Sequence, residues 1–178
     1  MSQKVYICCD CPAKFLREGL RPEAGNLPRH VTIIHPIEVS DAPSEGFHQP
    51  AQEVIEVVDY AIQGVQPFSL ALVGLKEHPN ADETSRVVSL KVGHCAELDL
   101  IRERCVDQLN RYVNPAFLFD FHVAVAKDLT AAASQAWLEN YVQTNGEFEP
   151  TKVPIVSIEV YLESGDGWRL QASRRLKP

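Results

Sequence analysis

Two short runs of mainly apolar residues, each headed by a histidine, set the strongest limit on the fold of this 178-residue chain. His30 begins the run His-Val-Thr-Ile, and His122 begins the run His-Val-Ala-Val about half a chain later. Short runs rich in β-branched residues are typical of strands, in which residues i and i+2 face the same side. We therefore expect His30 to share a face with Thr32, and His122 to share a face with Ala124, with the intervening valines in a core.

The order of the predicted elements repeats around these two runs. Each histidine strand is followed by a helix pattern and then by two strand patterns: helix 51–66 with strands 68–73 and 86–92, and helix 130–144 with strands 153–163 and 168–173. A strand over 4–9, a short helix over 13–18 and a helix over 97–113 complete the pattern. This order predicts an α+β fold in one bilobal domain, residues 1–178, built from duplicated half-units. Its two pseudo-symmetric lobes are each expected to be an antiparallel sheet with helices outside, enclosing a central cleft.

Local signals fix several element ends. Thr130 is a good N-cap for the third long helix, and Gly146 is a good stop for it. The sequence Ser-Gly-Asp-Gly over 164–167 predicts a hairpin between the last two strands. Residues His78-Pro79-Asn80-Ala81-Asp82 have the composition of a turn-rich connection.

Charge and composition narrow the class of partner. The chain carries 17 basic and 24 acidic residues and a net charge of -7. Proteins that bind extended duplex nucleic acid are usually basic, so we expect no such partner, whereas a small phosphate pocket needs only a few donors. No apolar run has the ~20 residues of a membrane span, and residues 1–12 do not resemble a signal peptide. We expect a cytoplasmic monomer that has no membrane partner.

The five cysteines are interpreted as packing residues. An odd number of cysteines indicates a reducing compartment. Cys8, Cys9 and Cys11 form a cluster that could suggest zinc, but the two pairs of ligands that zinc prefers are not evident, because Cys95 and Cys105 fall in or beside a predicted helix. Cys8 and Cys9 continue an apolar strand, on which neighbouring side chains point to opposite faces. We expect no metal site.

Two histidines at one cleft are suited to phosphoryl chemistry. A neutral imidazole can take a proton from the attacking oxygen while an imidazolium protonates the leaving oxygen, and both states are accessible because the ordinary pKa is ~6.5. A hydroxyl two residues after a histidine adds a directional donor to a phosphate oxygen. No metal or cofactor is required by this scheme.

These motifs resemble those of the two-histidine (2H) phosphoesterase superfamily, in its 2′-5′ RNA ligase-like and cyclic phosphodiesterase branch. The family signature is a pair of His-x-Thr/Ser-x motifs, which residues 30–33 match fully and residues 122–125 match except at Ala124. Pro28 and Pro36 around the first motif, the pair Ala126-Lys127 after the second, the run 67–72 and Trp168 in the last strand extend the resemblance over nearly the whole chain.

The resemblance implies a phosphoesterase that acts on a 2′,3′-cyclic phosphate or a 2′-5′ phosphodiester of a nucleotide or RNA end. His30 and His122 would be the catalytic acid and base, and Thr32 would bind a phosphate oxygen. Ala124 removes the second hydroxyl, a loss worth roughly 2–4 kcal/mol in a transition state. The alternative is therefore a nucleotide- or RNA-binding module with weak or no catalysis.

The remaining candidates have simpler interpretations. Lys127 could replace the missing donor, but it faces away from His122 unless the strand ends or bulges first. His35 lies five residues after His30, and we expect it on the opposite side, at a strand end or in a loop. His48, His78 and His94 are expected to be exposed. Trp168 is expected to pack in the last strand, although an aromatic ring near a cleft could stack a base.

Overall fold

The computed structural model of the protein describes residues 2–16, 20, 29–40, 50–79, 84–113, 120–164 and 167–178. Within these ranges the strands are β1 (Ser2–Asp10), β2 (His30–Ser40), β3 (Phe68–Pro79), β4 (Arg86–Val92), β5 (His122–Leu129), β6 (Thr151–Ile155), β7 (Ser157–Ser164) and β8 (Gly167–Arg175). The α-helices are α1 (Pro50–Ala61), α2 (Ala96–Gln108) and α3 (Ala131–Asn145), and a 3-10 turn, η1, covers Ala13–Phe15.

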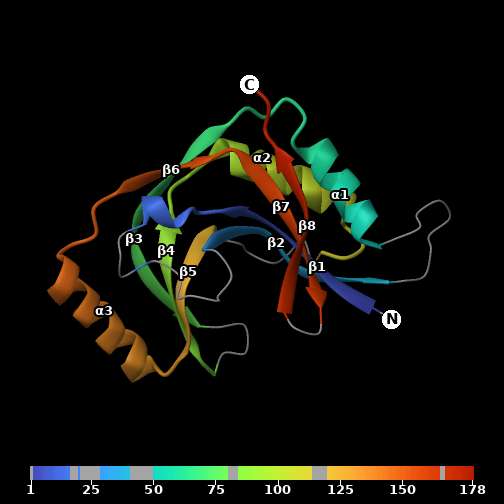
Figure 1. Ribbon diagram of the computed structural model, residues 1–178. Coiled ribbons are helices and arrows are strands. Elements are labelled where there is room, and N and C mark those ends of the chain that lie inside the picture. Colours follow the sequence, from blue (N-terminus) through green and yellow to red (C-terminus); the bar gives the residue numbers. More distant parts are fainter. Residues whose placement is uncertain are drawn as a thin grey trace.

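All eight strands join one curled antiparallel sheet in the order β6-β3-β4-β5-β2-β1-β7-β8 (Figure 1). Its two four-stranded halves meet between β5 and β2, where Val31 lies opposite Val123. The Arg29 guanidinium strengthens this junction by donating a hydrogen bond to the Ala124 carbonyl at 3.0 Å. The predicted α+β class is confirmed, with the two halves continuous through this junction.

Each histidine strand lies with strands from the other half of the sequence. β2, which begins at His30, is in the half that contains β7 and β8, whereas β5, which begins at His122, is in the half that contains β3 and β4. The strand pairs that follow the two histidine strands are thus exchanged between the halves of the sheet. The duplication of half-units stays a prediction, but the exchange explains how both histidine strands come to the centre of one sheet.

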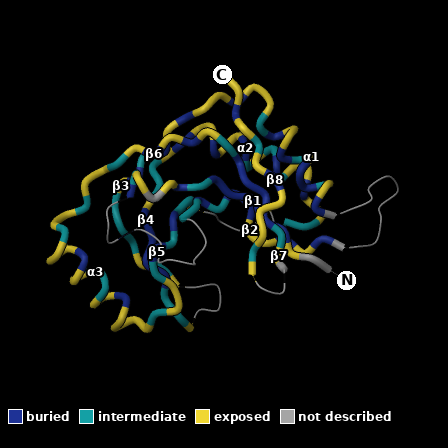
Figure 2. The backbone as a smooth tube through the Cα atoms, in the orientation of Figure 1, coloured by how far each residue is buried: buried dark blue, intermediate teal, exposed yellow. Residues whose placement is uncertain are grey.

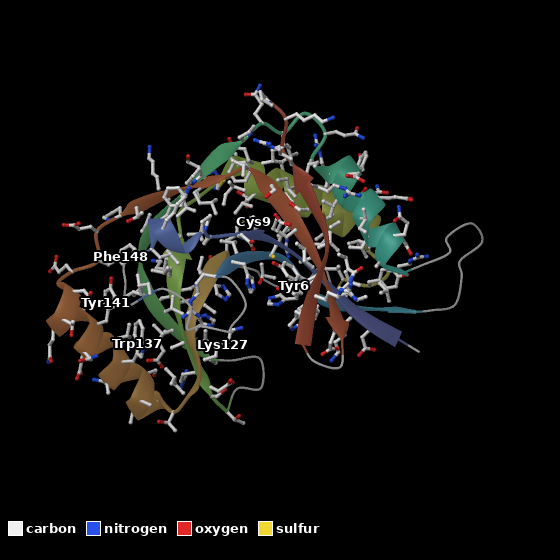
Figure 3. All side chains as sticks on the ribbon, in the orientation of Figure 1. Tyr6, Cys9, Lys127, Trp137, Tyr141 and Phe148 are labelled. Atoms are coloured by element: carbon white, nitrogen blue, oxygen red, sulfur yellow. The ribbon has the colours of Figure 1, made fainter. Side chains whose placement is uncertain are left out.

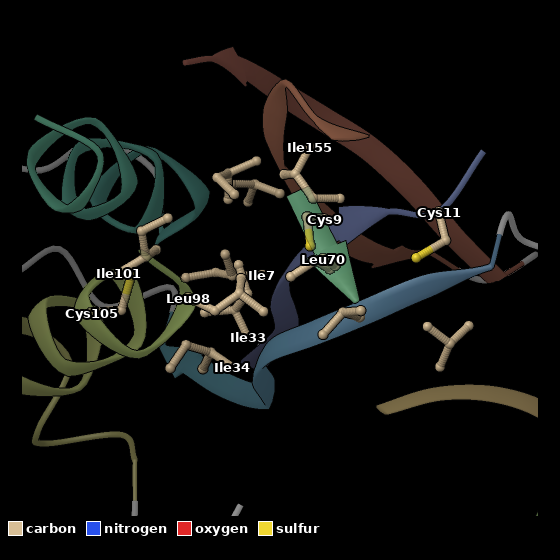
Figure 4. Packing of buried hydrophobic residues seen from close by; sticks show 14 of the residues in the cluster. Ile7, Cys9, Cys11, Ile33, Ile34, Leu70, Leu98, Ile101, Cys105 and Ile155 are labelled. Atoms are coloured by element: carbon tan, nitrogen blue, oxygen red, sulfur yellow. The ribbon is translucent and has the colours of Figure 1, made fainter. Parts of the chain in front are cut away.

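The helices cover one face of the sheet, and the main hydrophobic core lies beneath them (Figures 2 and 4). α1 and α2 lie together over the half that contains β1, β2, β7 and β8, and α3 flanks β4 and β5 (Figure 1). α2 and its C-cap bury one apolar face fully in this core, formed by Leu98, Ile101, Cys105 and Leu109. Because these helices bury one side of the sheet, the other side is left for polar residues.

Several predicted boundaries differ from the structure. The run 153–163, predicted as one strand, forms β6, an edge strand, and β7, which lies next to the opposite edge of the sheet, with Val156 between them in the chain. α1 ends at Ala61 rather than at residue 66, and Gly64 follows with a positive φ of 73° that glycine adopts readily. The hairpin prediction is confirmed by the pairing of Ser164 with Gly167, and residues 165–166 lie outside the described residues.

Candidate functional site

The two histidine motifs meet on the face of the sheet that the helices do not cover. Val31 and Val123 are both fully buried in the main core, and the residues beside them are half-buried on the other face. With Val31 opposite Val123 in an antiparallel pair, His30 lies opposite Ala124 and Thr32 opposite His122. We call the face that carries these four residues the site face.

The two imidazoles are diagonal neighbours on the site face. Diagonal residues on adjacent antiparallel strands are separated by ~7–8 Å at their Cα atoms. That spacing accommodates a phosphorus centre between two side chains while leaving each ring within reach of a different oxygen. The structure therefore brings together the residues that the sequence singled out, His30, Thr32, His122 and Ala124.

His122 is held in one tautomer and kept neutral. Its Nδ1–H donates to the carbonyl oxygen of Asp120 at 2.8 Å, which puts the proton of the neutral ring on Nδ1 and the lone pair on Nε2. Burial lowers the pKa of His122 to about 4, because the hydrogen bond from Nδ1 offsets only part of the desolvation. The charges of His78 and Lys76 lower this pKa further. A neutral imidazole is the form required of a general base.

β3 supplies the neighbours of His122 that the sequence prediction missed. β3 extends to Pro79, so His78 is a strand residue, and its ring centroid lies 4.7 Å from that of His122 in a T-shaped contact. Nδ1–H of His78 donates to the Pro79 carbonyl, and Nε2 is buried with no hydrogen-bond partner among the described residues. The polar sequence around His78 resembles a turn, and only its pairing with β4 makes it a strand.

Lys76 places a positive charge near His122. Its Nζ bonds the Asp120 carboxylate at 2.6 Å and thereby lowers the pKa of that carboxyl. Asp120 thus contacts Lys76 through its side chain and His122 through its carbonyl oxygen. No sequence motif marks Lys76, because its role depends on the alignment of β3 with β5 across β4.

His30 lies beside an aromatic cluster formed by Tyr6, Tyr161 and Trp168. Tyr6 can be located in Figure 3. The Tyr6 ring lies 5.4 Å from the His30 ring, stacks on Tyr161 at 5.1 Å and meets Trp168 edge-on at 4.6 Å. This cluster is separate from the main core. The packing role predicted for Trp168 is confirmed, and the cluster brings aromatic rings up to one catalytic candidate.

The position predicted for His35 is wrong. β2 continues to Ser40, so His35 lies within the strand rather than at its end. Ile7 pairs with Ile34 while Cys8 pairs with Thr32, so Ile33 is an extra residue, a β-bulge, and both isoleucines are buried in the main core. The bulge shifts His35 onto the site face, and the charge of His35 lowers the pKa of His122.

A second bulge changes the interpretation of Lys127. Ser89 pairs with Ala124 and Val88 with Ala126, so Val125 is an extra residue on β5. Both Val125 and Ala126 pack against the main core, and the next side chain, exposed Lys127, therefore turns to the site face. The charge of Lys127 lowers the pKa of His35, as does that of Arg102, with burial as the larger cause.

The cysteines behave as packing residues. Cys9 and Cys11 lie in the main core, and Cys8 lies in the aromatic cluster on the other face, as strand alternation predicts. All five thiols are free and buried, and burial raises the pKa of Cys11 and of Cys105 to about 12. Among the described residues, no group of three or more His, Cys, Asp or Glu side chains is placed to hold a metal ion.

Two acidic residues complete the His30 end of the site face. Asp10 is the register partner of His30, and burial together with the charge of Glu159 raises the pKa of Asp10 to about 6. Glu159 is buried, and its Oε1 accepts hydrogen bonds from Ser157 at 2.7 Å and Ser173 at 2.9 Å. One end of the site face is therefore aromatic and acidic, whereas the other end is cationic.

The remaining candidates lie elsewhere. His94 is exposed and contacts Asp99, and His48 and Pro28 lie outside the described residues. A shallow depression of about 340 Å³ near the C-terminus contains none of the site residues; it is lined by Pro67, Val156, Arg175, Leu176, Lys177 and Pro178. In the described part of the chain, no helix is both long and apolar enough to cross a membrane.

Comparison with known families and structures identifies relatives of this architecture. The family model described as the 2′-5′ RNA ligase superfamily matches residues 12–167. A search of curated proteins found no match.

Several solved structures share the fold. LigT from E. coli, solved in complex with 3′-AMP, is 15% identical with a TM-score of 0.60, and all of both chains is covered. A structure described only as a phosphoesterase is also 15% identical, with a TM-score of 0.61 and full coverage of both chains. Usb1 from Kluyveromyces marxianus is 12% identical with a TM-score of 0.56, over 98% of each chain.

Proposed function

Because the chain belongs to the 2′-5′ RNA ligase superfamily, we propose that it is a metal-independent phosphoesterase acting on a 2′,3′-cyclic phosphate or 2′-5′ phosphodiester of a nucleotide or RNA end. The observation that carries the proposal is the Val31–Val123 pairing, which sets His30 and His122 diagonally on one open face. The structures of LigT with 3′-AMP and of Usb1 with uridine monophosphate support a nucleotide as the ligand class.

The different surroundings of the histidines suggest their roles in hydrolysis. Nε2 of neutral His122 takes a proton from water as the water oxygen bonds to phosphorus. His30, as imidazolium, gives a proton to the ribose oxygen as its bond to phosphorus breaks. The lowered pKa of His122 keeps its imidazole neutral and therefore able to accept a proton in this step, and the roles reverse in the opposite direction.

Thr32 is the proposed donor to a non-bridging phosphate oxygen. Its hydroxyl lies on the same face as both rings, because Thr32 is opposite His122 and two residues from His30. A donor aimed at developing negative charge is worth about 10²–10³ in rate. Lys127, brought to the same face by the bulge at Val125, adds positive charge to this surface.

The test is turnover of a 2′,3′-cyclic nucleotide in excess chelator. We expect wild-type protein to open the ring, and His30→Ala and His122→Ala each to lose at least about 10²-fold in kcat/KM. The matched control is His94→Ala, which removes an exposed imidazole just before α2. Full activity of either site variant would refute the paired-histidine mechanism.

Ala124 supports the alternative of a binding module with little catalysis. It leaves the second motif without the hydroxyl that the first motif has in Thr32. In that case the protein binds a mononucleotide without turnover on long incubation, and His30→Ala and His122→Ala weaken that binding. The turnover assay and the binding assay together separate the two functions.

A further inference from the structure

Ser89 is a fully buried hydroxyl directly beside the incomplete motif. It lies on β4 as the register partner of Ala124, so both side chains project to the site face. The next pair, Leu90 with Val123, points the other way and is fully buried in the main core. Ser89 is 0% exposed, and its Oγ has no hydrogen-bond partner among the described residues.

An unpartnered buried hydroxyl needs a physical explanation. Buried polar groups are normally hydrogen-bonded, and exceptions occur where a group serves a ligand or an ordered water. Ser89 lies in one row across the sheet with Lys76 on β3 and Ala124 on β5. Ser89 therefore lies between Lys76 and Ala124, the position at which the family motif has a hydroxyl.

We propose that Ser89 on β4 replaces the hydroxyl that Ala124 lacks on β5, and acts as a positioning residue for the phosphate. This inference rests on the proposed function. Facing residues have Cβ atoms about 4.5–5.5 Å apart, so Ser89 Oγ lies beside the Ala124 methyl group. Because Ser89 is covered and Ala124 is half-buried, the hydroxyl reaches a phosphate oxygen through one water bound over Ala124.

The central experiment combines Ser89→Ala with Ala124→Ser. Ser89→Ala is expected to lower kcat/KM by about 10- to 100-fold, because a donor to the transition state is lost. Its melting temperature should stay equal or rise, because no hydrogen bond to another protein group is broken and a buried hydroxyl without a protein partner is removed. The double variant Ser89→Ala/Ala124→Ser should regain activity to within a few-fold of wild type, since the second substitution restores the hydroxyl of the family motif.

The control and the contrary outcomes are well defined. The control is Ser69→Ala, which removes an exposed hydroxyl from the neighbouring strand β3 and should change neither activity nor melting temperature. Wild-type activity in Ser89→Ala, failure of Ala124→Ser to rescue it, or a fall in both melting temperature and activity would each overturn the role of Ser89. None of these results affects the proposed function, which depends on His30 and His122.

Inorganic phosphate is the probe if wild-type protein has no turnover. Its binding is followed by NMR through the imidazole signals of His122. Weaker phosphate binding in Ser89→Ala than in wild type, with recovery in the double variant, would support the role of Ser89 even though the proposed catalysis had failed. Equal affinity in wild type and Ser89→Ala, or no phosphate binding by wild type, would overturn it.

Discussion

The two central histidines have opposite chemical surroundings. His122 contacts His78 and lies near Lys76, in a partly desolvated environment that disfavours its protonation. His30 contacts Tyr6 and is paired in register with Asp10. Such asymmetry around two like residues is a common way for one site to hold both an acid and a base. This difference in surroundings arises from the side chains that the neighbouring strands supply, since the two motifs themselves are almost identical.

At the residue scale, Asp10→Asn is expected to stabilise the protein at neutral pH. The folded pKa of about 6 lies above the ordinary value of ~3.9, so the folded state binds more protons than the unfolded state between these values. Stability contributed by protonated Asp10 is therefore present below about pH 4 and lost as pH rises through 6. Asparagine mimics the protonated form and should raise the free energy of unfolding by about 1–3 kcal/mol at pH 7.5.

Urea unfolding of both proteins at pH 7.5 and pH 4 measures this effect. The gain should shrink toward zero at pH 4, where Asp10 is protonated in the folded state. Asp107→Asn, at an exposed position on α2, is the matched control and should show no such gain. A gain from Asp10→Asn that is the same at both pH values would show that ionisation of Asp10 is not its cause.

At the scale of elements, strand bulges decide which residues reach the site face. Simple alternation places His35 and Lys127 away from His30 and His122, respectively. The bulges at Ile33 and Val125 each add one residue, which reverses the alternation beyond them. Neither bulge has a sequence signal of its own, because both extra residues are ordinary β-branched residues. The pairing of neighbouring strands determines them.

The N-cap of α3 provides a prediction at this scale. The sequence predicts Thr130 as the cap of this helix, and its Oγ1 accepts a hydrogen bond from the Ala133 N–H at 3.2 Å. Thr130→Ala should lower the free energy of unfolding by about 1 kcal/mol, because that N–H loses its partner. Thermal unfolding provides the measurement. Thr144→Ala, in the last turn of the same helix, should cost nothing, and an equal loss there would contradict the capping argument.

At the scale of the whole molecule, one narrow junction joins the two halves of the sheet. Val31 opposite Val123 is the register pair observed between β2 and β5, and Arg29 adds a hydrogen bond to the Ala124 carbonyl. The exchange of strand pairs puts one histidine on each side of this junction. The separation of His30 and His122 therefore depends on contacts at the centre of the sheet.

A pair of valine variants tests this dependence. Val123 and Val153 are both fully buried, but Val153 lies in edge strand β6. Replacing either by alanine should lower the free energy of unfolding by about 1–3 kcal/mol, through lost burial and the resulting cavity. Only Val123→Ala should also lower kcat/KM, measured well below both unfolding transitions. Equal activities of the two variants would show that the junction does not set the histidine geometry.

Much of the fold and the centre of the site were predictable from the sequence. The apolar face of α2, the cap of α3 and the strands that begin at His30 and His122 follow from local periodicity and turn chemistry. The division of 153–163 into β6 and β7 was missed, because each strand satisfies its hydrogen bonds with a distant partner. Local pattern contains no information about that choice of partner.

By itself, the sequence determined the α+β class, the two histidine strands and the hydroxyl missing at Ala124, since each depends on residue type and short-range spacing. Only the tertiary structure decided what surrounds those histidines: His78 and Lys76 beside His122, the aromatic cluster beside His30, and Ser89 opposite Ala124. The physical reason is that cross-strand register joins residues far apart in sequence. A single bulge then changes which side chains meet.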